Sequence, residues 1–585
     1  MSPRLIVGTA ALLLACSVHA AAPAEKPWVT ASNANTRLVL EAQAAFGPEN
    51  ASQTGLAQYD GLAMDLGPDL SKRYVAAMQN VLGELNARLA KETDPNVLQD
   101  LQILIGSVQD DITGTGLADK YNLDWNDVPG MVFGNLQRML DDQTPAARRI
   151  KTLELLQRYV GQFPGTTPMT ELAKQRFAES RGAGRTGPFK ARVQQSIDNV
   201  PTYVTGIRDL FAEYKIAGAE KALDAMEKQF ADYSAWQKAN VLPVARTDFR
   251  LPPEMYAFRL KQVGIDIDPI LLMQRAQVEF METRAAMQAL APLVAKQKGL
   301  AATDYRDVIR ALKKDTIAND KLESFYADVN KQLEAAIVRE RIVDLPTRPM
   351  VMRLASPAES AAQPAPHMQP PALVDNTGEQ GQFVLPVSNP TAGKGEAYDD
   401  FNFPSAAWTL SAHEGRPGHE LQFSAMIERG VSQARVLYAF NSVNVEGWAL
   451  YAEAESLPYE PLDGQMIALQ HRLLRALRAM LDPMLNLGMI SREDAGKVLS
   501  DQVMLSPAMT RQELDRYTFR APGQAGSYFY GYSRILQLRA ETEVALGAKF
   551  DRLKFNNFLL DQGLLPPDLL AKAVREEFVP AQRTK

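Results

Sequence analysis

Residues 411–419 read SAHEGRPGH, and they contain two of the five histidines of the chain, six positions apart. A glutamate directly follows the first histidine. Zinc hydrolysis needs this arrangement, because neutral imidazoles bind the cation and the adjacent carboxylate takes a proton from the attacking water. We therefore predict that His413 and His419 bind zinc and that Glu414 is the general base.

The six-residue spacing differs from the common His-Glu-x-x-His pattern, in which the two ligands lie four residues apart on one helical face. Six residues of an ideal helix turn about 600°, so the two rings would point about 120° apart. Pro417 and Gly418 supply an interruption, because proline removes a helical hydrogen bond and glycine tolerates unusual φ values. We expect a helix over about 404–416, a local break or bulge, and a second helix over 419–429.

A third ligand is expected downstream, in the stretch NVEGWALYAE at residues 444–453, which we place on a helix over about 435–456. Glu446 and Glu453 are seven residues apart and so lie within about 20° of one helical face. One carboxylate can bind zinc while the other orients a histidine ring. We predict Glu446 as the ligand and Glu453 as the orienting residue. The alternative role for Glu446 is a buried salt bridge.

Three ordered motifs carry a family resemblance: HExxPGHxxQ at 413–422, EGWALYxE at 446–453 and PGQAxxYxxG at 522–531. Together they resemble the family called domain of unknown function 885 (DUF885), which is similar to gluzincin metallopeptidases. The resemblance covers most of the chain. It implies a large, bilobed helical fold with a deep cleft, and it leaves exopeptidase, dipeptidase and oligopeptidase activities open. Glu420 stands where the family often has a further histidine, which makes the surroundings of His419 more acidic.

The same resemblance implies a role for Tyr528, at the end of the third motif. A phenol beside zinc can donate a hydrogen bond to the oxyanion of the tetrahedral intermediate. We therefore predict that Tyr528 stabilises the transition state, with Tyr530 and Tyr532 as alternatives.

For several further residues, the sequence does not decide whether they contact the substrate. Arg520, Arg534 and Arg539 could each bind a substrate carboxylate, although a surface role is at least as compatible with the sequence. His367 lies in a proline-rich stretch and could reach the cleft. We expect His471, on an amphipathic helix over 469–485, to be a surface or packing residue.

Periodicity predicts a mainly α fold. Apolar residues recur at helical spacing before residue 344 and again after residue 396, so we expect a helical scaffold over 21–344 and a helical catalytic region over 396–585. Prolines accumulate over 345–395, where we expect a loop or hairpin with a small β insertion near 345–390. Short strands are expected within 349–355 and 382–387. The resemblance favours one continuous domain over 21–585.

Composition and the N-terminus restrict location and partners. Residues 1–20 have the charge, apolar run and small residues of a signal peptide, so we expect a secreted or periplasmic protein. Anchoring as a lipoprotein through Cys16 is the less favoured alternative. Because Cys16 is the only cysteine, the mature chain has no cysteine chemistry. The net charge of −6 argues against nucleic acid as partner. No later apolar run is long enough to span a membrane.

These observations predict a secreted zinc-dependent hydrolase that acts on peptides. A zinc hydrolase of another amide or ester is an alternative, and so is a silent helical binding protein. The silent protein would be expected to lack Glu414, which is present. Peptide specificity and oligomeric state cannot be predicted from this sequence.

Overall fold

The computed structural model describes residues 26–182, 184–387 and 399–584. They form a mainly helical protein with one small sheet, which confirms the predicted fold class. The predicted signal peptide and Cys16 lie outside the described residues.

The first part of the chain is entirely helical, with short connections. α12 illustrates why these helices form: Asp268 accepts a hydrogen bond from Ile270 N at the N-terminus, and Gly299 ends the helix with φ 67°. The helices of this part are α1 (Pro27–Ala44), α2 (Pro48–Thr54), α3 (Leu70–Leu89), α4 (Pro95–Tyr121), α5 (Val128–Met139), α6 (Ala146–Arg149), α7 (Lys151–Tyr159), α8 (Met169–Glu179), α9 (Lys190–Glu213), α10 (Glu220–Asn240), α11 (Pro253–Gln262), α12 (Pro269–Lys298), α13 (Tyr305–Leu312) and α14 (Asn319–Arg339).

A three-stranded sheet follows, as predicted for the proline-rich stretch. The strands are β1 (Val351–Leu354), β2 (His367–Gln369) and β3 (Gln382–Leu385), with α15 (Pro357–Ala362) between the first two. β3 lies in the middle and is buried, parallel to β1 and antiparallel to β2. β1 and β3 were expected from the sequence. β2 was not, because three residues between prolines carry no strand pattern.

Ten further helices follow in the described residues, of which α19 is buried along most of its length and packs against α12, α16 and α22. They are α16 (Pro404–Glu414), α17 (His419–Glu428), α18 (Ser442–Ser456), α19 (Leu462–Asn486), α20 (Arg492–Val498), α21 (Pro507–Asp515), α22 (Ser527–Leu546), α23 (Arg552–Asp561), α24 (Pro567–Ala573) and α25 (Val579–Arg583). Two π-helical turns matter below: η3 (Ala434–Tyr438) and η6 (Arg516–Arg520).

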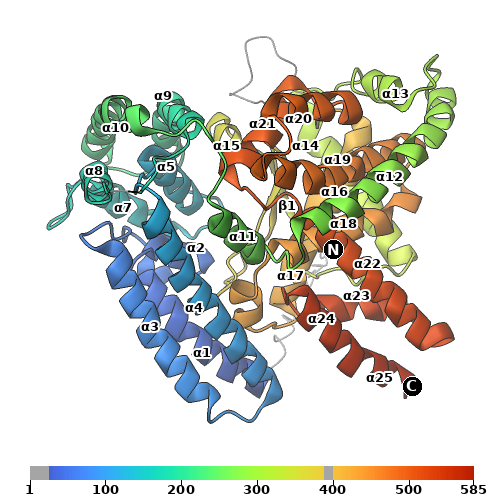
Figure 1. Ribbon diagram of the computed structural model, residues 1–585, viewed down its shortest axis with the longest axis horizontal. Coiled ribbons are helices and arrows are strands. Elements are labelled where there is room, and N and C mark those ends of the chain that lie inside the picture. Colours follow the sequence, from blue (N-terminus) through green and yellow to red (C-terminus); the bar gives the residue numbers. More distant parts are fainter. Residues whose placement is uncertain (1–25, 183, 388–398, 585) are drawn as a thin grey trace, which may run out of the picture.

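The two parts of the chain lie side by side, with α1–α10 on the left of Figure 1 and α12, α19 and α22–α25 on the right. Buried polar contacts join them. Asp100 on α4 accepts hydrogen bonds from Arg435 Nε (2.8 Å) and Ser432 Oγ (2.5 Å), and all three residues are buried. Within the described ranges, no helix has the length and apolar character that a membrane crossing requires.

Candidate metal site and active-site cavity

The chain between the two histidines changes direction sharply. α16 ends at Glu414, Gly415 leaves the helical region (φ −93°, ψ −121°), and α17 begins at His419. The expected helix to about 416 is therefore two residues too long, whereas the break and the second helix from His419 are as expected. A Cβ on Gly418 would lie 1.9 Å from the carbonyl oxygen of His413, so only glycine fits this turn. The His413 and His419 rings consequently lie edge to face, with centroids 4.7 Å apart.

Glu446 joins the two histidines from α18. Its Oε2 lies 3.5 Å from His413 Nε2 and 3.3 Å from His419 Nε2, and the three atoms lie within 4.8 Å of one another. Bonds of about 2.0–2.1 Å to a tetrahedral zinc place neighbouring ligand atoms about 3.4 Å apart. Glu446 Oε2 is buried and has no aligned hydrogen-bond donor among the described residues. A cation would satisfy this atom, so the donor set fits zinc.

Glu453 fixes the orientation of His413. His413 Nδ1 donates to Glu453 Oε1 at 2.6 Å, and Thr409 Oγ1 donates to Glu453 Oε2 at 2.7 Å. Burial alone would raise the pKa of Glu453, but the Arg475 guanidinium and the His413 ring outweigh it and hold the pKa at about 2. An ionised Glu453 keeps the proton on Nδ1, which leaves Nε2 free to bind a metal.

The charges around His413 favour a cation in the absence of metal as well. Burial disfavours protonation of this ring, yet the nearby carboxylates of Glu446 and Glu453 outweigh burial and raise the pKa of His413 to about 9. Burial likewise opposes ionisation of Glu446, but the two histidines lower its pKa well below the usual value. These charges make the site suited to a cation.

Glu414 lies beside the metal ligands without joining them. Its Oε1 is 3.9 Å from His413 Nε2, and its Oε2 accepts a hydrogen bond of 2.9 Å from Met368 N on β2. The edge strand thus holds one carboxylate oxygen, and the carboxylate lines the same cavity as the histidines.

Tyr528 approaches from α22 because two glycines let α18 and α22 touch. A Cβ on Gly447 would lie 2.6 Å from the Gly531 carbonyl carbon, and one on Gly531 would lie 1.9 Å from Val443 O. The Tyr528 ring stacks near His413, with centroids 6.2 Å apart. Its hydroxyl accepts a hydrogen bond of 3.1 Å from Arg516 Nη2, which leaves the phenolic proton free to be donated.

The two alternative tyrosines are engaged elsewhere. Tyr530 donates to Asp266 and accepts from Arg534 Nη1 at 2.8 Å, and the Tyr532 ring lies below the Arg472 guanidinium, 5.1 Å from it. Neither lines the cavity at the metal site, whereas Tyr528 does. Burial raises the pKa of Tyr528, so its hydroxyl is protonated at neutral pH.

A cavity of about 500 Å³ opens over these residues. Its walls come from α16–α19, α21, α22, residues 362–370 and η6. Of the residues left open by the sequence, His367, His471 and Arg520 line it. Arg534 and Arg539 do not; their partners are Asp568 and Tyr530 for Arg534, and Glu455, Glu543 and Tyr451 for Arg539.

This wall also contains a group of charged residues that the sequence did not predict. Arg475 and Arg478 on α19, Glu513 on α21 and Arg516 on η6 line the cavity around Tyr528. His471 is buried in the same wall. Glu420, which we expected to make the surroundings of His419 more acidic, is fully buried and accepts from Arg416 Nε at 2.6 Å, so its charge is compensated.

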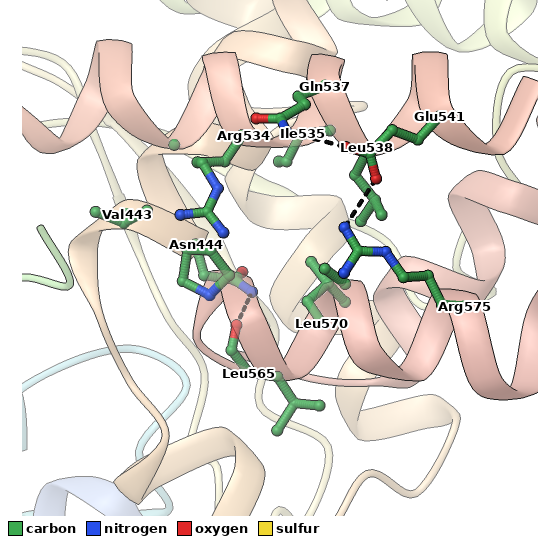
Figure 2. Close-up of a pocket in the computed structure, with 13 residues that line it drawn as sticks. Val443, Asn444, Arg534, Ile535, Gln537, Leu538, Glu541, Leu565, Leu570 and Arg575 are labelled. Atoms are coloured by element: carbon green, nitrogen blue, oxygen red, sulfur yellow. Dashed lines mark hydrogen bonds and ion pairs between the residues drawn. The ribbon is translucent and has the colours of Figure 1, made fainter. Parts of the chain in front are cut away.

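A separate hollow between α18, α22 and α24 is much smaller (Figure 2). Its volume of about 30 Å³ has room for only one or two water molecules. Arg534 lies there, together with Arg575, which donates to Glu541 at 2.8 Å. This hollow contains no member of the histidine and glutamate group, so the large cavity is the candidate active site.

Comparisons with known proteins agree with this architecture. The sequence model of the family described as "Bacterial protein of unknown function (DUF885)" matches residues 48–574. A solved structure described as "the putative lipoprotein from Colwellia psychrerythraea" shares 18% identity with a TM-score of 0.75, over 95% of this chain and 99% of that one. Another, "a putative lipoprotein of unknown function from Shewanella oneidensis", shares 18% identity with a TM-score of 0.69, over 94% and 100%. At this identity they show a common fold alone. No curated protein matches the sequence.

Proposed function

The chain belongs to the DUF885 family, and from that premise we propose that it is a zinc-dependent hydrolase that cleaves peptide bonds. One observation carries the proposal. The buried Glu446 Oε2 faces two histidine nitrogens at 3.3 and 3.5 Å, which is the spacing of ligand atoms around a tetrahedral zinc ion. Three protein ligands and an open cavity are typical of catalytic zinc sites, whereas structural sites have four protein ligands.

Each residue of the site has a distinct task in this proposal. His413, His419 and Glu446 would hold the metal. When bound, zinc polarises the scissile carbonyl and makes the attacking water more acidic. Glu414 takes the proton of that water as it adds to the carbonyl carbon, and then passes the proton to the leaving nitrogen as the C–N bond breaks. Its hydrogen bond from Met368 N holds the carboxylate toward the cavity.

Tyr528 would stabilise the negative charge that develops on the carbonyl oxygen. Its hydroxyl accepts from Arg516, so the phenolic proton can be donated to that oxygen. Glu453 keeps His413 in the tautomer that binds metal through Nε2. Glu414 and Tyr528 thus act in the reaction itself, and the other four residues bind the metal or orient a ligand.

The cavity supports a peptide as substrate. About 500 Å³ is enough for a short peptide, and the wall combines apolar side chains such as Phe423 and Leu474 with the polar residues above. A second cavity of about 530 Å³ shares Ala362, His367 and Met368 with its wall. Another amide or an ester would meet the same catalytic residues.

We also propose export of this protein. The first residues have the pattern of a signal peptide, and the two proteins of similar fold are described as putative lipoproteins. Anchoring through Cys16 and release as a soluble periplasmic protein are both compatible with this. The N-terminal residue of the protein purified from its host distinguishes them.

Metal content measured beside hydrolysis of a peptide library tests the proposed activity. We expect about one zinc per chain and metal-dependent cleavage. His413→Ala and His419→Ala should lose both. A protein that keeps its full zinc content in both variants would have its metal elsewhere. A zinc-loaded protein that cleaves esters or other amides, but no peptide, would fit the alternative hydrolase.

A further inference from the structure

We propose that Arg516 binds the C-terminal carboxylate of the substrate, so that the enzyme removes single residues from the carboxyl end of peptides. This inference rests on the proposed function. The proposed function leaves open whether the enzyme cleaves at an end or in the interior of a peptide, and the inference addresses this choice.

Beside Tyr528, arginines outnumber the carboxylates that form salt bridges with them. Three guanidiniums lie near the Tyr528 ring, with their central carbons 4.5 Å (Arg478), 5.4 Å (Arg516) and 5.8 Å (Arg475) from its centroid. The only carboxylates within salt-bridge distance of them among the described residues are Glu513 and Glu453. These two carboxylates thus serve three arginines, and Glu453 also accepts from His413.

Two of the arginines are already committed. Arg478 makes two hydrogen bonds to Glu513, at 2.6 and 2.8 Å, and its side chain is 6% exposed. Arg475 donates to His471 O, lies 3.6 Å from Glu453, and its side chain is 7% exposed. Both therefore belong to the protein interior.

Arg516 differs from both. Its side chain is 29% exposed and lines the cavity. Its nearest carboxylate oxygen, on Glu513, is 3.8 Å away. Within the described part of the chain, its only side-chain hydrogen bond is to the Tyr528 hydroxyl. An arginine has five N–H donors in a planar fork that matches a carboxylate, so Arg516 keeps donors available for a ligand.

The distance from the reacting carbonyl suits a C-terminal carboxylate. In a peptide, the carboxylate carbon of the last residue lies two bonds beyond the scissile nitrogen, about 3–4 Å from the scissile carbonyl carbon. Tyr528, the proposed oxyanion donor, lies 3.1 Å from Arg516 Nη2. The Arg516 guanidinium, one hydrogen bond away from the oxyanion donor, is thus within reach of the carboxylate of the leaving residue. It is too close to the reacting carbonyl to bind a carboxylate several residues further along the substrate.

The resulting reaction is balanced. Water adds its oxygen to the carbonyl carbon of the penultimate residue, and the bond from that carbon to the nitrogen of the last residue breaks. Glu414 transfers the water proton to this nitrogen. The products are a peptide shortened by one residue with a new carboxylate, and a free amino acid whose original carboxylate is the group held by Arg516.

The inference is tested with N-acetylated tetrapeptides of one sequence that end in either a free acid or a carboxamide. We expect the wild type to cleave the free acid with a kcat/KM at least about tenfold higher, since a hydrogen bond to a charged group contributes roughly a factor of 10–100. Arg516→Gln should bring the ratio of the two peptides close to one, and Arg516→Lys should restore part of it. Arg520→Gln is the control, because Arg520 lines the cavity but donates to Gln195, and it should keep the preference for the free acid.

Binding to the zinc-loaded Glu414→Gln variant separates recognition from chemistry. The free acid should bind about tenfold or more tightly than the carboxamide, and adding Arg516→Gln should abolish the difference. Equal cleavage of acid and carboxamide by the wild type would overturn the inference and leave the proposed hydrolase intact. So would an equal loss on both peptides in Arg516→Gln, since Arg516 would then act only through Tyr528. If carboxamides ending in Asp or Glu are cleaved with the same kcat/KM as the free acid, the enzyme recognises a side-chain carboxylate and the inference is wrong. Absence of any peptide cleavage by the zinc-loaded protein would refute the proposed function itself.

Discussion

Removing the negative charge of Glu453 tests whether His413 is held as a metal ligand. Glu453 is buried on α18 and accepts from both His413 and Thr409, so Glu453→Gln keeps the shape but loses the charge that holds the Nδ1 proton. Substituting such a supporting carboxylate costs a metal site 10–100-fold in affinity, or about 1.4–2.7 kcal/mol. We expect this loss for zinc, measured by competition with a chelator of known affinity.

Glu460 is the matched control. It is also a buried glutamate, seven residues further along the chain, and neither carboxylate oxygen has a hydrogen-bond partner in the described ranges. Burial, helped by the charge of Glu453, raises the pKa of Glu460 well above its usual value. Because Glu460 has no hydrogen bond to His413, His419 or Glu446 in these ranges, Glu460→Gln should leave zinc affinity unchanged. Equal zinc affinities for Glu453→Gln and the wild type would refute the role assigned to Glu453.

Three further predictions follow from the site and its helices. Without metal, the pKa of His413 is about 9, and zinc must displace that proton, so zinc affinity should rise by up to about tenfold per pH unit from pH 6.5 to 9; a flat titration between these values would contradict it. Gly531→Ala should destabilise the protein by about 1–3 kcal/mol and weaken zinc binding, because its Cβ would meet Val443 O at 1.9 Å; Gly83→Ala, on the exposed face of α3 with no atom nearby, should be neutral or stabilising in the same denaturant titration. Tyr528→Phe should lower kcat by about 100-fold or more with zinc retained, and an unchanged kcat would exclude the proposed oxyanion donor.

The sequence was informative where the relevant geometry is local. The seven-residue spacing of Glu446 and Glu453 predicts one helical face, and both side chains do point to His413 from α18. Pro417 and Gly418 predicted a break between the histidines, although its form could not be predicted. The close contact of Gly418 with the His413 carbonyl oxygen depends on the path of the whole turn.

Other features depend on tertiary packing. The expected helix over 435–456 is correct for Ser442–Ser456 but is interrupted before it, because the π-turn η3 ends at Tyr438 and Asn441 caps a new helix by accepting from Asn444 N at 2.8 Å. The arginine group around Tyr528 brings together α19, α21 and η6. Arg475 and Arg478 lie on an amphipathic helix whose arginines would ordinarily be exposed, so their burial has no signal in the sequence.

The same packing explains His471. A histidine on a helix rich in leucine and arginine is compatible with a surface or packing position. The structure buries it beside Arg475, in the wall of the cavity. Only the burial of α19 on most of its faces, which follows from its contacts with α12, α16 and α22, places His471 there.

The most direct test of the central claim is zinc stoichiometry measured beside kcat in Glu414→Gln and Glu446→Gln. Glu414 lies beside the metal ligands with its carboxylate 3.9 Å from His413 Nε2, whereas Glu446 Oε2 faces both histidines. Glu414→Gln should therefore keep about one zinc per chain and lose at least about 100-fold in kcat, and Glu446→Gln should lose zinc. A Glu414→Gln protein that loses zinc while Glu446→Gln keeps it would exchange the base and the ligand. A Glu414→Gln protein with full zinc and full activity would contradict the mechanism.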